Sequence, residues 1–174
     1  MLTLNQITDM FYALTMTLLG FDPDDPTKQD RVRTAWPAVG APAWERTDDV
    51  CFMQVTLSPD QYTQQIESTY SPQGLLIQSF TEVAAVSWIF YGPSSFDDSR
   101  KIRAGLFKPS TFETLSLQDT YLVTDVPEPV RSPELFNGQW WDRSNLFARF
   151  NIKTEIKEAI PHLETADIVV IPNR

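Results

Sequence analysis

The sequence predicts a mixed fold of α-helices and a largely antiparallel β-sheet, and two patterns carry this prediction. Apolar residues near the N-terminus recur with the period of a helix, whereas apolar and polar residues alternate in several stretches farther along the chain. In the clearest alternation, residues 143–153, polar and basic side chains dominate one parity and four apolar ones the other: Leu146, Ala148, Phe150 and Ile152. This period is that of a half-buried antiparallel strand, with one face open to water or a partner.

Length and composition predict one domain over residues 1–174, long enough to bury a core without disulfides or metals. With 14 Lys and Arg against 23 Asp and Glu, the net charge of −9 disfavours broad binding to nucleic acid or anionic membranes. The one cysteine, Cys51, lies in an apolar run, which predicts a buried, inert thiol in a reducing compartment. We expect no signal peptide and no membrane span, because the chain lacks a basic leader and a run of about 18 apolar residues.

The first element is predicted as an amphipathic helix over residues 3–19. Thr3 or Asn5 suits the N-cap position, and Gly20 suits the left-handed position after the last turn. A single apolar stripe indicates packing on a sheet or on another subunit. The residues of this stripe are spaced three or four apart: Leu4, Ile7, Phe11, Leu14 and Leu18.

Residues 21–44 are predicted as loops around one short strand at residues 31–36. The segment from Phe21 to Asp30 contains four aspartates without the spacing of a calcium loop, so a solvated acidic loop is the favoured interpretation. Trp36 and Trp44 lie in or beside a stretch broken by Pro and Gly. Each of them is either buried within its own loop or exposed for contact with a partner protein.

Two long strands are predicted in the middle of the chain. The first covers residues 50–57, and the second covers residues 75–91, where apolar residues occupy both parities. We expect the second strand to be central in the sheet and covered by a helix. The polar segment 58–74 between them is predicted to contain a short helix, because three of its residues stand at helical spacing: Tyr62, Ile66 and Tyr70.

A turn at Gly92-Pro93 is predicted to end the second long strand and to precede another helix. This helix begins at Ser94 or Ser95, where Asp97 or Asp98 completes a capping box, and it ends near Phe107. Short strands are expected at residues 121–124 and, after Pro161, at residues 168–171.

The sequence contains no recognisable catalytic or cofactor-binding set. Its six glycines form no phosphate-binding or dinucleotide-binding motif. The one histidine is His162, and the sequence has no G-x-S-x-G nucleophile motif for which it could act as the base. We therefore expect no enzymatic activity, no cofactor and no metal. A remote alternative is a small metal-dependent hydrolase that uses Asp48-Asp49 or Asp97-Asp98, although no Lys or His base accompanies either pair.

Charged residues in the C-terminal third have two open interpretations. Arg131 and Glu134 bracket Ser132-Pro133, and Arg143 and Arg149 lie on the polar parity of the long strand. They either form surface ion pairs within the chain, each worth little, or belong to a network between subunits. Neighbouring prolines and tryptophans favour the network, since arginine and aromatic residues dominate interface energetics.

Several segments, in order along most of the chain, resemble the phage neck terminator family, the tail-terminator or tail-completion proteins of tailed bacteriophages. Asn145 stands where that pattern suggests an acidic residue, which puts a charged contact at this position in doubt. The matching segments are residues 33–37 and 40–44, Tyr91-Gly92-Pro93 with Phe96, residues 102–107, residues 129–134, and residues 140–143 with Phe150-Asn151.

The resemblance implies an α+β fold with one mixed, largely antiparallel sheet and helices packed on it. It also implies a sixfold homo-oligomeric ring in the virion neck, assembled in the host cytoplasm, that caps the tail tube and ends tail polymerisation. The expected partners are the tail tube protein, the head-side connector and the tail sheath, while DNA passes through the lumen without specific binding.

An alternative within the same class is a head-completion, connector or tail-tube protein. For the ring and docking surfaces, the candidate residues are Trp36, Trp44, Tyr91, Arg131, Glu134, Trp140, Trp141 and Arg143.

Overall fold

The computed structural model describes residues 1–35, 43–59, 61, 65–72 and 74–159. Its helices are α1 (Leu4–Leu19), α2 (Ser95–Leu106) and α3 (Pro109–Ser116), and a 3₁₀ turn covers Gln29–Arg31. The strands are β1 (Val32–Thr34), β2 (Val50–Ser58), β3 (Glu67–Ser71), β4 (Leu75–Tyr91), β5 (Thr120–Leu122), β6 (Val130–Arg131), β7 (Glu134–Phe136), β8 (Gln139–Trp141) and β9 (Arg143–Ala159).

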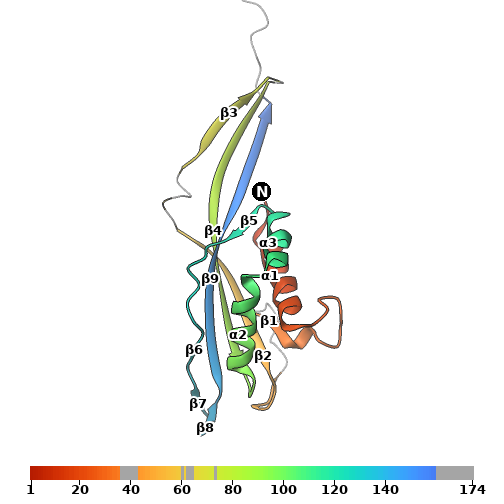
Figure 1. Cartoon of the computed structure of the whole chain (residues 1–174), viewed down its shortest axis with the longest axis vertical. Coiled ribbons are helices and arrows are strands. Elements are labelled where there is room, and N and C mark those ends of the chain that lie inside the picture. The colour runs from red at the N-terminus through yellow and green to blue at the C-terminus, as the bar shows by residue number, and fades with distance from the viewer. Residues whose placement is uncertain (36–42, 60, 62–64, 73, 160–174) are drawn as a thin grey trace, which may run out of the picture.

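The main sheet has the strand order β1–β2–β4–β9–β5, with β3 paired to β4 and β6 paired to β9. Only β1 and β2 pair in parallel within the described part of the chain. The helices lie beside one half of this sheet, and β3, β4 and β9 extend beyond them as an arm (Figure 1). The hairpin β7–β8 lies at the opposite end of the molecule (Figure 1). The predicted α+β fold with a mixed, largely antiparallel sheet is confirmed.

Strands β4 and β9 form the central pair of the sheet. They are antiparallel along their whole length, from Leu75 opposite Ala159 to Tyr91 opposite Arg143. Strand β2 flanks the second half of β4, where residues of both parities are buried from Val83 to Val86. The predicted central strand is therefore confirmed. Its first half is only partly buried, because it belongs to the arm.

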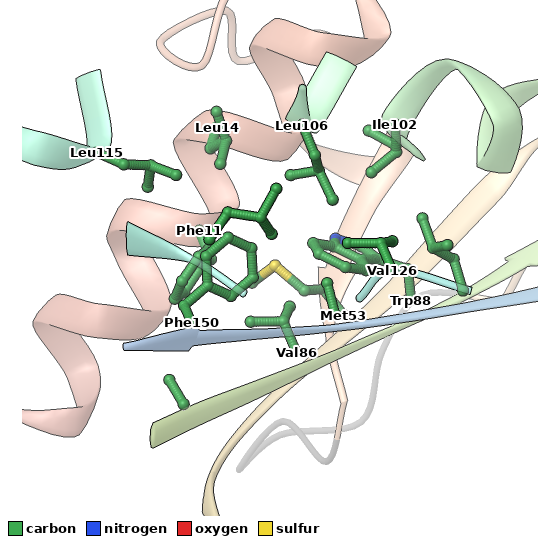
Figure 2. Close-up of a cluster of buried hydrophobic side chains, with 14 of the residues drawn as sticks. Phe11, Leu14, Met53, Val86, Trp88, Ile102, Leu106, Leu115, Val126 and Phe150 are labelled. Carbon is green, nitrogen blue, oxygen red and sulfur yellow. The ribbon is translucent and has the colours of Figure 1, made fainter. Parts of the chain in front are cut away.

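The hydrophobic core lies between the helices and one face of the sheet (Figure 2). The sheet contributes Val86 and Trp88 from β4 and Phe150 from β9, and the helices contribute Phe11 from α1 and Leu106 from α2. The alternation predicted for β9 is confirmed, since four side chains of one parity are buried: Leu146, Ala148, Phe150 and Ile152. Cys51 is buried as predicted, and burial raises the pKa of its thiol well above the usual value of 9.0.

The first helix has the ends that its sequence predicts. Thr3 accepts a hydrogen bond from the backbone of Gln6 and the Gln6 side chain caps Thr3 in return, which completes a capping box. Gly20 has a φ of 92°, a left-handed conformation that glycine adopts without strain. The capping box predicted for α2 is wrong, because Ser94 makes no side-chain cap and its N–H binds Asp49 instead.

The short helix predicted within residues 58–74 is wrong where the structure describes this segment. Residues Glu67–Ser71 form β3, which pairs with β4 through a turn at Gly74, where φ is 75°. The pairing exposes Tyr70 on the arm instead of burying it. Helix α3 has no counterpart in the sequence prediction. Trp36, Tyr62, His162 and the strand predicted at residues 168–171 lie outside the described residues.

One buried polar contact joins the first helix to the centre of the sheet. The indole N–H of Trp88 donates a hydrogen bond of 2.9 Å to the hydroxyl of Thr15. Both side chains are almost fully buried, so no water replaces this contact. No described helix is long and apolar enough to span a membrane.

Thr15→Val is expected to lower the free energy of unfolding by about 1–3 kcal/mol, because it leaves the buried indole N–H of Trp88 without an acceptor. Thr17→Val is the matched control, since Thr17 lies on the same helix and bonds its own backbone in the same way but is exposed. Urea unfolding of both variants measures the difference. Equal losses contradict the proposed role of the buried contact.

Candidate functional site

The candidate site lies at the end of the sheet away from the arm tip, where β4 ends and β9 begins. The hairpin β7–β8 is located there, and Trp44 reaches the same place from the loop before β2. Asn137 and Gly138 form the turn of the hairpin with φ values of 49° and 74°, which suits Asn-Gly. The sequence therefore builds this end from a tight hairpin and a strand terminus.

Gly92 holds three chain segments together at this end. Its φ is 103°, and a Cβ at this position would stand only 2.4 Å from the carbonyl oxygen of Asp48. Its N–H donates a hydrogen bond of 3.2 Å to the backbone carbonyl of Asp142, between β8 and β9. Any side chain here would separate the end of β4 from the loop before β2.

Aromatic side chains from these segments surround a pocket of about 350 Å³. Trp44 is the central ring, with centroid distances of 5.0 Å to Phe52, 5.9 Å to Tyr91 and 6.1 Å to Trp141. Phe136 extends the cluster and contacts Trp141 edge-on at 6.0 Å. Edge-to-face contacts of this kind add about 0.5–1.5 kcal/mol each beyond area burial. We call this group of residues the aromatic pocket.

A polar network closes one side of the aromatic pocket. The Tyr91 hydroxyl donates a hydrogen bond of 2.8 Å to Glu134, and the Arg143 guanidinium donates one of 3.2 Å to the same carboxylate oxygen. Arg143 also lies over the Tyr91 ring and donates to Asn145. Burial, followed by the hydrogen bond to Glu134, raises the pKa of Tyr91 above 10.0.

The hairpin has two different faces. Glu134 pairs with Trp141 and Phe136 pairs with Gln139, and these residues form or adjoin the wall of the aromatic pocket. Leu135 pairs with Trp140 on the other parity, and 62% of the Trp140 surface is exposed. Phe136 is 63% exposed despite its contact with Trp141. Large apolar side chains gathered on an exposed hairpin mark a surface suited to a protein partner.

Each aspartate pair of the hydrolase alternative contains a carboxylate with structural partners. Asp98 is buried and accepts hydrogen bonds from Arg31 at 3.1 Å and Lys101 at 2.8 Å. Asp49 accepts the N–H of Ser94 and lies 3.7 Å from Arg31. In the described ranges, no three His, Cys, Asp or Glu residues converge as a metal site.

The structure brings together five of the residues singled out in the sequence: Trp44, Tyr91, Glu134, Trp141 and Arg143. Trp140 lies on the other face of the hairpin. Arg131 pairs with Asp142 at 3.5 Å and lies over the ring of Phe96. Arg131, Glu134 and Arg143 thus make ion pairs within the chain.

The sequence analysis missed Phe52, Leu135 and Phe136 as residues of this surface. Phe52 in β2 lies on the same face of the sheet as Tyr91 in β4. Nothing in the sequence indicates which loop covers Phe52. The Asn137-Gly138 dipeptide was a usable signal, because it predicts a hairpin that exposes its flanking apolar residues.

A comparison with protein-family models matches residues 5–174 to a family described as phage neck terminator protein. The match covers all the described elements from the second residue of α1 onward. A search of curated proteins gives no match.

Tyr91→Phe is expected to destabilise the chain by an amount that shrinks as the pH rises above about 10. The folded chain retains the Tyr91 proton where the unfolded chain loses it, so this contribution is complete below the unfolded pKa and is lost at higher pH. Urea unfolding of wild type and variant across this range measures the difference, with Tyr70→Phe as the exposed control. A difference that stays constant or grows with pH contradicts the prediction.

Gly92→Ala is expected to cost more than about 1 kcal/mol of stability, because it combines a positive φ with a clash against the backbone of Asp48. Gly20→Ala is the matched control: its φ is also positive, at 92°, but no atom lies within 4 Å of the place that a Cβ would take there. Thermal unfolding compares the two variants. A loss for Gly92→Ala no larger than that for Gly20→Ala shows that the close approach has no energetic consequence.

Proposed function

The chain belongs to the phage neck terminator protein family, and from this premise we propose that it forms the sixfold ring that caps the finished tail tube. Membership places it among structural proteins of the bacteriophage neck, which are part of the virion and contact other neck and tail proteins. In the proposed role, the ring ends tail polymerisation and joins the tail to the head-side connector. The family match over residues 5–174 carries this proposal.

The aromatic pocket and the hairpin β7–β8 form the proposed docking surface of the ring. Hot spots of protein interfaces are rich in Trp, Tyr and Arg held in rigid positions. Here Tyr91, Trp141 and Arg143 are fixed by contacts within the chain, whereas Trp140 projects from the same hairpin toward solvent. We assign this surface to the tail tube or the connector, with the pocket receiving a partner side chain.

The charge of the chain supports an inert passage for DNA. A net charge of −9 on each copy gives a sixfold ring a strongly negative field, which repels phosphate. The proposed ring therefore lets the genome pass without specific binding.

Trp140→Ala tests the docking surface without disturbing the fold, because the side chain is mostly exposed. Its stability is expected to stay within about 0.5 kcal/mol of wild type. The concentration needed to cap tail tubes during their polymerisation in vitro is expected to rise about tenfold or more, as for a hot-spot residue. Tube lengths measured by electron microscopy report capping.

Phe112→Ala, on the exposed side of α3, is the control and should cap tubes at the wild-type concentration. If Trp140→Ala caps as well as wild type, the hairpin is not the docking surface. If the wild-type protein does not alter tube length at any concentration, the terminator role itself is contradicted.

A further inference from the structure

The arm of the sheet has no described helix on either face. It consists of β3 with residues 75–80 of β4 and 154–159 of β9, and it projects beyond α1 and α3 (Figure 1). Three strands without a covering layer bury little apolar surface, so such an element is marginal by itself. The arm therefore needs further contacts in the assembled state.

One edge of the arm has no partner strand among the described residues. Strand β9 pairs with β4 on one side as far as Ala159, but on its other side the pairing with β5 extends only to Ile152, opposite Thr120. The last backbone contact on that side is the N–H of Lys153 bound to the carbonyl of Asp119 at 2.9 Å. From Thr154 to Ala159, no described residue pairs with this edge. Its free N–H and C=O groups form a template for another strand.

The two faces of this edge differ in character. Lys153, Glu155 and Lys157 share one parity and form ion pairs with each other at 2.9 and 3.8 Å. On the other parity, Ile156 is 44% exposed next to the exposed Glu158, and Tyr70 on β3 is 72% exposed on the same face. An added strand with apolar side chains would cover Ile156 and leave the charged face in water.

The sequence offers a candidate for such a strand in residues 160–174, which directly follow β9 along the chain. Residues 168–171 read Ile-Val-Val-Ile, four β-branched residues without charge, which strongly favour a strand. They begin nine positions after Ala159, so an extended chain carries them up to about 30 Å from the tip.

The sequence after β9 favours departure from the arm over a return to it. Pro161 restricts the preceding Ile160 to extended conformations, and no glycine or asparagine occurs between them and Ala166. The hairpins of this chain, by contrast, turn at Gly74 and at Asn137-Gly138. We therefore expect this sequence to reach a second copy and not to return to its own arm.

We propose that residues 168–171 of one copy add as a strand to the open edge of β9, between Thr154 and Ala159, in the next copy of the ring. This inference rests on the ring proposed above. The tail and the edge are different surfaces of one chain, so the contact is heterologous and closes only as a ring or continues as a filament. Backbone hydrogen bonds give the affinity, and the apolar side chains cover Ile156.

A labelled peptide of residues 160–174 tests the edge directly. It is titrated by fluorescence anisotropy into the full-length Val169→Asp/Val170→Asp chain, whose own tail is disabled while its edge is intact. Saturable binding is expected. The affinity is expected to be at least tenfold lower when the peptide carries the same two substitutions, or when Ile156→Asp is added to the chain. Ile66→Asp, an exposed isoleucine beside β3, is the control and leaves binding unchanged.

A mixture of two full-length variants then tests whether the tail of one copy binds the edge of another. The Ile156→Asp variant keeps an intact tail (residues 160–174) but has a disabled edge. The Val169→Asp/Val170→Asp variant keeps an intact edge but has a disabled tail. Each variant alone is expected to be monomeric. Mixed above the dissociation constant of the peptide, they can form one contact per pair, so light scattering should show a dimer.

Absence of saturable peptide binding, or equal binding of the substituted peptide, overturns the proposal. A mixture that remains monomeric although the peptide binds shows that the tail of a full-length copy does not reach the edge of another, and it overturns exchange between copies. If both variants form rings like wild type, the ring stands and this contact is wrong. If wild type forms no ring, alone or on tubes, the proposed ring is contradicted. The peptide titration then still tests whether residues 168–171 bind the edge of β9.

Discussion

The antiparallel pairing of β4 with β9 is the constraint on which the rest of the structure depends. A slip of one residue would turn every buried side chain of β9, such as Phe150, to the opposite face. The same register places Tyr91 beside Arg143 at one end and Leu75 beside Ala159 at the other. The core, the aromatic pocket and the open arm edge are thus consequences of one pairing.

The sequence was sufficient to predict the helices and strands that have a single strong pattern, and it was ambiguous for the others. Strand β9 and helix α1 follow from alternation and capping, which are local properties. The error at β3 has a simple cause: Ile66 and Tyr70 are four apart, and residues four apart share a face in a strand as well as in a helix. Helix α3 was missed because its sequence, PSTFETLS, has few strong helix formers.

The candidate site was predictable in composition but not in arrangement. Tryptophan and arginine near a proline-rich segment indicated an interface, and the structure gathers Trp44, Tyr91 and Trp141 at one end. Whether a residue faces the pocket or the solvent depends on the parity within β8, which separates Trp141 from Trp140. That parity follows from the turn at Asn137-Gly138. The approach of Trp44 is a tertiary contact with no local signal.

In the proposed ring, the two ends of the molecule have different tasks: we assign the arm and its edge to contact between copies, and the aromatic end to docking with other neck and tail proteins. Electron microscopy of the purified protein mixed with tail tubes, together with its mass by light scattering, tests this account most directly. The account predicts a sixfold ring at tube ends. A protein that remains monomeric and leaves tube ends bare would contradict it.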